Sequence, residues 1–263
     1  MLKIAALQLS TQALSNARLD YYLRICEQKD VRLVALGEYV LNNFFTELKQ
    51  MPVDLVKEQS KVKLEALKEY SAKYNLCIVA PIILSTNKGF NKTCLVANKG
   101  KIKYINQQVF MPYSHWNEKD FFINSTKAIK LHTFKCDNFK IGVLFGYEIH
   151  FDEFFKKANE LDLLIIPTAN TYNSNSRWCE LIKMRAFLNN TNILRVNRIG
   201  VSEVDELEWN FYGNSFLCNA YGDIVQELSD AEEVLISEIS KPSEAAKFWQ
   251  FKEVRNEINK RLL

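Results

Sequence analysis

KIGVLFGYEIHFDE, residues 140–153, has the pattern of a buried strand that turns directly into a helix. The apolar run at 139–145 is typical of a strand covered on both faces, and helical periodicity follows at 151–161. Gly146 stands between the two. A strand that leads into a helix in this way is the building unit of α/β proteins.

The rest of the chain repeats this alternation of strands and helices. Two turn sequences, NKGK at 98–101 and AYGD at 220–223, predict hairpins, the second joining strands at 215–218 and 224–228. The combination predicts a mixed sheet covered by helices. Further strands are predicted at residues 3–9, 31–36, 76–83, 93–98, 101–105, 161–167 and 192–197, and helices at 16–29, 53–74 and 178–189.

Length and composition fit one large α/β domain over residues 1–263, with no linker or low-complexity tract. The 34 basic and 31 acidic residues are mixed along the chain, and the net charge of +3 gives no reason to expect a nucleic-acid or membrane surface. The apolar run at 1–9 is too short for a signal peptide or a transmembrane span and is predicted to be the first core strand.

The six cysteines form no C-x-x-C pair and show no metal-type spacing with the three histidines. Free thiols in a cytoplasmic protein are therefore predicted. We expect neither a metal nor another cofactor.

Further short motifs occur in a fixed order along nearly the whole chain. They are KIAALQ at 3–8, RLVALGEY at 32–39, NKTCLV at 91–96, LLIIPTAN at 163–170, and the spacing W-x6-R-A-x2-N at Trp178, Arg185, Ala186 and Asn189. In order and spacing these motifs resemble the nitrilase superfamily of carbon–nitrogen hydrolases. The resemblance implies a four-layer αββα sandwich and hydrolysis of amides, nitriles or N-carbamoyl compounds through a Glu-Lys-Cys triad.

The family's nucleophile turn reads roughly K-I-G-x-x-I-C-Y-D-x-R-F-P-E, and its cysteine falls on Gly146 of this chain. Glu38 matches the glutamate that serves as general base, although Gly37 replaces the usual preceding proline. The catalytic lysine falls within YINQQVFMP at 104–112, where the two candidate positions are both glutamine, Gln107 and Gln108. The resemblance therefore implies that one residue of the triad is retained and two are replaced.

The resemblance also supplies a second glutamate, which Glu118 matches. It places four further residues in the wall of the pocket: Trp116, Tyr147, Asn170 and Tyr172. Because members of the family assemble through helices on one face of the sandwich, a homo-oligomer is expected, and a hetero-oligomer is an alternative.

Amide hydrolysis by this route needs a thiolate to form an acyl-enzyme, a carboxylate to carry protons, and a cation plus a backbone N–H to hold the oxyanion. Gly146 removes the nucleophile, and loss of a nucleophile alone costs on the order of 10⁴–10⁶ in rate. The sequence therefore predicts a catalytically inactive relative that is retained as a small-ligand-binding protein or as an oligomer partner.

Two alternatives keep catalysis. In the first, Glu38 activates a water in the space vacated at Gly146, with the Tyr147 N–H and a glutamine side chain as oxyanion donors. In the second, an unrelated residue such as Cys179 or Lys103 has moved into the site. The geometry of the pocket distinguishes these alternatives from loss of function.

Overall fold

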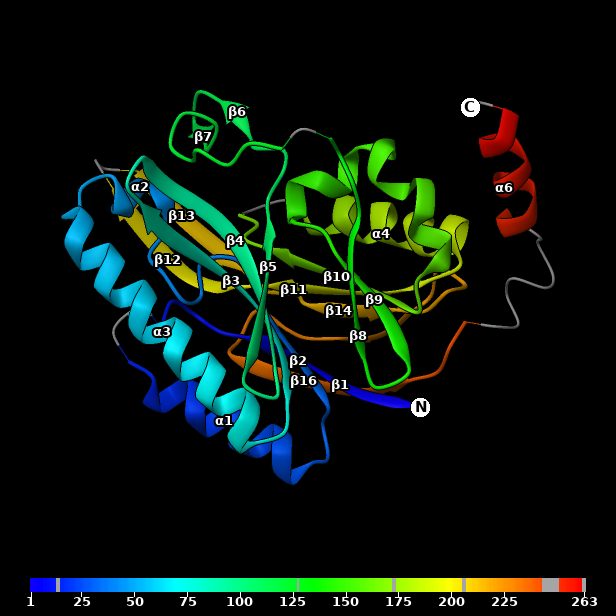
Figure 1. The fold of residues 1–263 in the computed structure, drawn as a ribbon, viewed down its shortest axis with the longest axis horizontal. Helices are drawn as coiled ribbons and strands as arrows, with labels where there is room; N and C mark the ends of the chain where they lie inside the picture. The colour runs from blue at the N-terminus through cyan, green and yellow to red at the C-terminus, as the bar shows by residue number, and fades with distance from the viewer. Residues whose placement is uncertain (13–14, 127, 172–173, 205–206, 243–250, 262–263) are drawn as a thin grey trace.

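The computed structural model describes residues 1–12, 15–126, 128–171, 174–204, 207–242 and 251–261, and the chain forms two six-stranded sheets (Figure 1). The first sheet has the order β16-β1-β2-β3-β4-β5 and the second β15-β14-β11-β10-β9-β8. The first contains β1 (Leu2–Gln8), β2 (Leu33–Leu36), β3 (Cys77–Thr86), β4 (Gly89–Asn98), β5 (Lys101–Asn106) and β16 (Glu233–Ile239). The second contains β8 (His132–Cys136), β9 (Phe139–Val143), β10 (Leu163–Thr168), β11 (Asn192–Asn197), β14 (Phe216–Cys218) and β15 (Ile224–Glu227).

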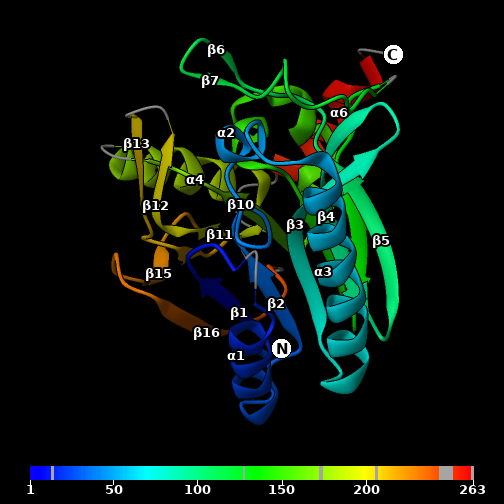
Figure 2. The ribbon, with the colours of Figure 1, turned by 90° about the vertical axis from the view of Figure 1, so that its left-hand side faces the viewer.

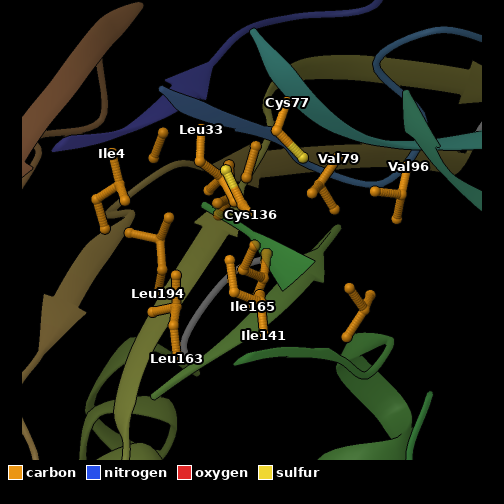
Figure 3. Packing of buried hydrophobic residues seen from close by; sticks show 14 of the residues in the cluster. Ile4, Leu33, Cys77, Val79, Val96, Cys136, Ile141, Leu163, Ile165 and Leu194 are labelled. Atoms are coloured by element: carbon orange, nitrogen blue, oxygen red, sulfur yellow. The ribbon is translucent and has the colours of Figure 1, made fainter. Parts of the chain in front are cut away.

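The central core lies between the two sheets, where side chains from both meet (Figure 3). Alternate residues of one strand enter different cores: Leu33 and Ala35 of β2 face the second sheet, while Val34 and Leu36 face the helices. Since both faces of these strands are covered, their sequences are continuous apolar runs and not alternating ones.

Helices cover the outer face of each sheet (Figure 2). Helices α1 (Ala17–Gln28) and α3 (Val53–Lys73) pack on the first sheet through residues such as Leu23 and Leu67. Helix α4 (Asn175–Asn189) packs on the second sheet through Ile182 and Ala186. The architecture is the four-layer αββα sandwich expected from the sequence.

Both predicted hairpins are confirmed. The turn between β4 and β5 has Lys99 at φ 50° and Gly100 at φ 75°, the left-handed conformations that a two-residue hairpin turn requires. The 220–223 turn joins β14 to β15 and has Gly222 at φ 86°. Here glycine is the residue that adopts this backbone conformation without a steric penalty.

The helix predicted at 151–161 is wrong in type. The segment after β9 forms two 3₁₀ helices, η1 (Gly146–His150) and η2 (Asp152–Glu160). Phe154, Phe155 and Ala158 are still buried against the second sheet. The apolar spacing therefore predicts which residues are buried, but it does not fix the hydrogen-bond pattern of the backbone.

Several short elements outside the predicted set complete the fold. They are α2 (Phe45–Leu48), β6 (Pro112–Tyr113), β7 (Trp116–Asn117), β12 (Ile199–Val204), β13 (Leu207–Tyr212) and α6 (Phe251–Arg261). Strand β16 is also outside the predicted set, and it pairs antiparallel with β1 along the whole length of β1.

Within the described ranges no helix is long and apolar enough to cross a membrane. The same residues contain no group of three or more His, Cys, Asp or Glu side chains that could hold a metal ion.

Candidate functional site

At the end of β2, the first sheet lies beside β10 and β11 of the second. The backbone N–H of Glu38, just beyond β2, donates to the carbonyl oxygen of Thr168 over 3.1 Å. A Cβ at Gly37 would lie 2.9 Å from the backbone nitrogen of Arg198 and 3.1 Å from the carbonyl oxygen of Thr168. Only glycine permits this approach, which explains why proline is replaced here and brings Glu38 to the edge of the second sheet.

Gly146 reaches the same place from β9. Its backbone N–H donates to Oε1 of Glu38 over 3.1 Å, and both residues are buried. A Cβ on Gly146 would lie 3.3 Å from that oxygen and 3.0 Å from Cγ2 of Thr168. The structure therefore brings together the residues matched to the general base and to the nucleophile, with the Glu38 carboxylate bonded to the backbone at residue 146.

An ammonium pairs with Glu38 after all, and it comes from Lys92 on β4. The Lys92 Nζ forms ion pairs with Oε2 of Glu38 and, at 2.6 Å, with Oε1 of Glu118. It also lies 4.5 Å from the centre of the Tyr39 ring, and the Tyr39 hydroxyl donates to the Glu118 carboxylate. All four side chains are buried, so the four groups form one ionic cluster beneath the surface.

The charges in this cluster shift one another's pKa. Burial raises the pKa of Glu38, and the neighbouring Glu118 carboxylate adds to that effect, while the Lys92 ammonium opposes it. Burial lowers the pKa of Lys92, but the carboxylates of Glu118 and Glu38 more than offset this, so the net shift is upward. Burial and the same two carboxylates hold the pKa of Tyr39 well above its usual range. Lys92 therefore stays protonated and Tyr39 stays a hydrogen-bond donor.

The two glutamines matched to the lysine position lie beside this cluster but point elsewhere. Gln107 is buried, its backbone N–H donates to the carbonyl oxygen of Lys92 over 3.1 Å, and its side-chain amide donates to Val109. The side chain of Gln108 bonds to the backbone of Lys130. Of the two, Gln107 is the neighbour of Lys92.

A third carboxylate, Glu148, lies behind the turn. Its Oε1 accepts the backbone N–H groups of Gln108 and Val109, and its Oε2 accepts that of Phe145 at 3.0 Å. Burial raises the pKa of Glu148 to about 7, although the three N–H donors oppose the shift. Glu148 fixes the turn that carries Gly146 to the segment that follows β5.

A cavity of about 580 Å³ opens above Glu38 and Gly146. Its walls are largely aromatic, and polar side chains such as Glu38, Asn170 and Arg177 lie among them. Besides Glu38 and Gly146, the described lining residues are Met111, Tyr113, His115, Trp116, Tyr147, His150, Phe151, Ala169, Asn170, Thr171, Ser174, Arg177 and Trp178. Volume and composition are those of a site for a small organic ligand.

Three of the residues expected in the pocket wall, Trp116, Tyr147 and Asn170, line this cavity, and Tyr172 lies outside the described residues. Glu118 is fully buried and is linked through the Lys92 ammonium to Glu38, which lines the cavity. Neither candidate for a replacement catalytic group is there. Cys179 is half-buried on α4, where burial raises the pKa of its thiol, and the Lys103 ammonium bonds to the Thr133 carbonyl on the surface.

The wall at Asn170 is held by Arg195, a fully buried residue that the sequence did not single out. Its guanidinium donates to Oδ1 of Asn170, Oδ1 of Asn175, the carbonyl oxygen of Asn214 and the hydroxyl of Tyr212 over 2.8–3.1 Å. Burial lowers its pKa. The one signal in the sequence is a charged residue in the middle of an apolar strand, because arginine is seldom fully buried.

Comparison with known proteins places these features in a family. The model of the carbon-nitrogen hydrolase family matches residues 3–247. A protein of Staphylococcus lugdunensis, named hydrolase in agr operon, is 26% identical over 220 residues, which cover 80% of this chain and 88% of that protein. A citrullinase of Francisella tularensis is 23% identical over 248 residues, covering 86% and 84%. The crystal structure of a carbon-nitrogen hydrolase from Helicobacter pylori superposes with a TM-score of 0.83 at 19% identity, covering 100% of this chain and 98% of that one.

Proposed function

This chain belongs to the carbon-nitrogen hydrolase family, and we propose that it binds a small amide-, nitrile- or carboxylate-like molecule without hydrolysing it. One observation carries the proposal: at the floor of the cavity, the position of the attacking cysteine is Gly146, whose N–H is bonded to the Glu38 carboxylate. A backbone N–H has no electron pair with which to attack a carbonyl carbon, so no acyl-enzyme forms there.

The position of the ammonium also argues against turnover. Of the described residues, Glu38 and Gly146 line the cavity, whereas Lys92 and Glu118 do not. An oxyanion is stabilised when donors lie about 3 Å from the place where it forms. The Lys92 Nζ is instead engaged by two carboxylates. The cluster therefore supports the floor of the cavity but presents no cation to a bound molecule.

The lining supports a ligand whose polar end meets Glu38. Glu38 is the sole carboxylate among the described lining residues, and each of its oxygens keeps a lone pair beyond the bonds to Gly146 and Lys92. The aromatic walls suit an apolar body, and Asn170 offers an amide at the side. A short amide whose NH₂ donates to Glu38 satisfies these groups.

The test measures ammonia release from amides, nitriles and N-carbamoyl compounds by the purified protein, with Glu38→Gln as control. We expect no release from either protein. Turnover by the wild-type protein that disappears in Glu38→Gln would overturn the proposal.

Binding is measured separately with butyramide and butyrate as probes, by ligand-observed NMR. We expect saturable binding of at least one probe and its loss in Ala169→Leu, which fills part of the cavity. Circular dichroism and the melting temperature show whether that variant keeps the fold. Absence of saturable binding by both probes would count against a ligand of this class.

A second candidate is a hydrolase in which Glu38 activates a water. The observation that favours it is the raised pKa of Glu38, a carboxylate that lines the cavity. A carboxylate whose pKa is raised above its ordinary value accepts a proton more readily. The same ammonia measurement decides between the two candidates, because only this one predicts turnover that depends on Glu38.

We also propose that the chain works as an oligomer, with a second copy as the preferred partner. Helices α4 and α6 expose large apolar side chains side by side, among them Met184, Leu188, Val254 and Ile258, beside a groove of about 570 Å³. Light scattering after size-exclusion chromatography tests this proposal. A dimer or larger assembly that becomes monomeric in Met184→Glu/Ile258→Glu supports it, and a wild-type monomer at micromolar concentration contradicts it.

A further inference from the structure

We propose that Lys92 is a positioning residue that has taken over, from the neighbouring strand, the place of the family's lysine. In this view the site lacks the nucleophile but keeps the charges that would activate one. The inference goes beyond the proposed function, because it concerns the ionic cluster and holds whether or not the natural protein turns over a substrate.

The first support is the register of the two strands. Thr93 of β4 pairs with Asn106 of β5, and the next residue, Gln107, donates its N–H to the carbonyl oxygen of Lys92. Lys92 on β4 and Gln107, the first residue after β5, are thus direct neighbours, about 4.8 Å apart in the hydrogen-bonding direction. The side chains of both are buried at this end of the sheet. A lysine side chain is long enough to carry its ammonium across one strand spacing.

The second support is charge balance. Glu38 and Glu118 both contact one ammonium, and the described residues supply no other cation to either carboxylate. Two buried carboxylates that share a site without a cation cannot both ionise, so one would take up a proton. Lys92 therefore favours the ionised form of Glu38 and holds its carboxylate beneath the cavity.

The third support is that one acceptor in the cluster is unused. Oε2 of Glu118 is buried and has no hydrogen-bond partner among the described residues. The cluster thus has room for a donor that approaches from another strand. Moving the ammonium back to residue 107 would require no new acceptor.

The test installs a thiol as a reporter, through Gly146→Cys. The introduced thiolate attacks the methylene carbon of iodoacetamide, a C–S bond forms, iodide leaves, and the thiol proton passes to the Glu38 carboxylate. A cation within ~4–6 Å lowers the pKa of an acid by about 1–3 units. At pH 6.5 the reporter should therefore react roughly tenfold or more faster with Lys92 present than with Lys92→Met. The alkylated peptide is quantified by mass spectrometry over a range of pH.

Two further variants test whether the effect depends on an ammonium within the ionic cluster or on any lysine nearby. The exchange Lys92→Gln/Gln107→Lys should restore at least half of the reactivity, because it returns an ammonium to the cluster from the residue that follows β5. Lys103→Met should leave the reporter unchanged, because Lys103 bonds to Thr133 on the surface. The Gly146→Cys and exchange proteins are checked for native circular dichroism before alkylation.

The outcomes are distinct. Equal pH profiles in folded Lys92 and Lys92→Met proteins would overturn the inference, as would a folded exchange variant whose thiol stays unreactive. If Lys92→Met does not fold, the exchange variant decides the question alone. None of these results depends on hydrolysis by the natural protein, so the inference and the proposed function can fail separately.

Discussion

The Glu148 carboxylate accepts the backbone N–H of Gln108 over 2.5 Å and so joins two segments that lie forty residues apart in the sequence. The turn after β9 and the segment after β5 meet at this one side chain, directly behind the cavity floor. Since the carboxylate is fully buried, its ionisation is linked to the stability of the site.

Glu148→Gln should remove a pH dependence of stability. Burial raises the pKa of Glu148 from 4.5 in the unfolded chain to about 7 in the folded one. A group whose pKa is raised on folding stabilises the protein below its unfolded pKa, and that contribution is lost as the pH rises through the folded pKa. Relative to Glu148→Gln, the wild-type protein should lose on the order of 3 kcal/mol between pH 4.5 and pH 8. Urea denaturation of both proteins across this range measures it, and a difference that stays constant with pH contradicts the prediction.

Gly146→Ala should destabilise the protein by about 1 kcal/mol, because the new methyl group would lie 3.0 Å from Cγ2 of Thr168. Thr168→Ser removes that carbon but keeps the hydroxyl, which bonds to Asn197. In the Thr168→Ser background, Gly146→Ala should therefore lower the free energy of unfolding by much less than it does in the wild-type protein. Chemical denaturation of the four proteins completes the cycle. If the effects of the two substitutions on the free energy of unfolding simply add, the new methyl group does not clash with Cγ2 of Thr168.

Arg195→Lys should cost about 2–3 kcal/mol although the charge is kept. The guanidinium reaches four acceptors at once, and an ammonium on a lysine stem cannot reproduce that fork. Tyr212→Phe removes only one of the four acceptors and should cost about 1 kcal/mol. The free energies of unfolding of the two variants provide the comparison. Equal losses would mean that the fork geometry is unimportant.

Mild oxidation should join Cys77 and Cys136. The two thiols come from opposite sheets, and the interaction between them lowers the pKa of Cys136 and raises that of Cys77 (Figure 3). The Sγ of Cys136 and the backbone N–H of Cys77 also approach the same carbonyl oxygen, that of Arg32. A disulfide here would close a long loop and stabilise the protein by about 4 kcal/mol.

Diamide, which accepts the two electrons and two protons, is the oxidant for this experiment. Peptide mapping without reductant should find the cross-link, together with a rise in melting temperature. Cys136→Ala serves as the control, and its melting temperature should not respond to diamide. A wild-type protein that keeps six free thiols after treatment would contradict the prediction.

The layers of the fold follow from the sequence because each buried strand is a local apolar run. The missed elements lack that signal. Strand β16 has only two fully buried residues, Leu235 and Ile239, and in β13 only Phe211 is buried. The position of Gly146 beside Glu38 was predictable too, since both residues sit in motifs of fixed order.

Lys92 was not predictable in the same way. It lies in the motif NKTCLV, where a lysine is typical of an exposed strand position, and its partners are 54 and 26 residues away in the sequence. The pairing appears only when β2, β4 and the segment carrying Glu118 are folded together. Arg195 is similar: the strand predicts its burial, but its four acceptors come from two separate loops, from the first residue of α4 and from β13.

The adjacency of Lys92 and Gln107 also restricts the evolutionary history of the site. A lineage that lost its lysine from position 107 first would pass through a protein with two buried carboxylates and no cation, which is costly to fold. A lineage that gained Lys92 first would pass through two ammoniums facing two carboxylates, which is neutral overall. The second path is the accessible one. Living sequences with lysine at both positions would be its surviving intermediates, and they would date the exchange relative to the loss of the cysteine.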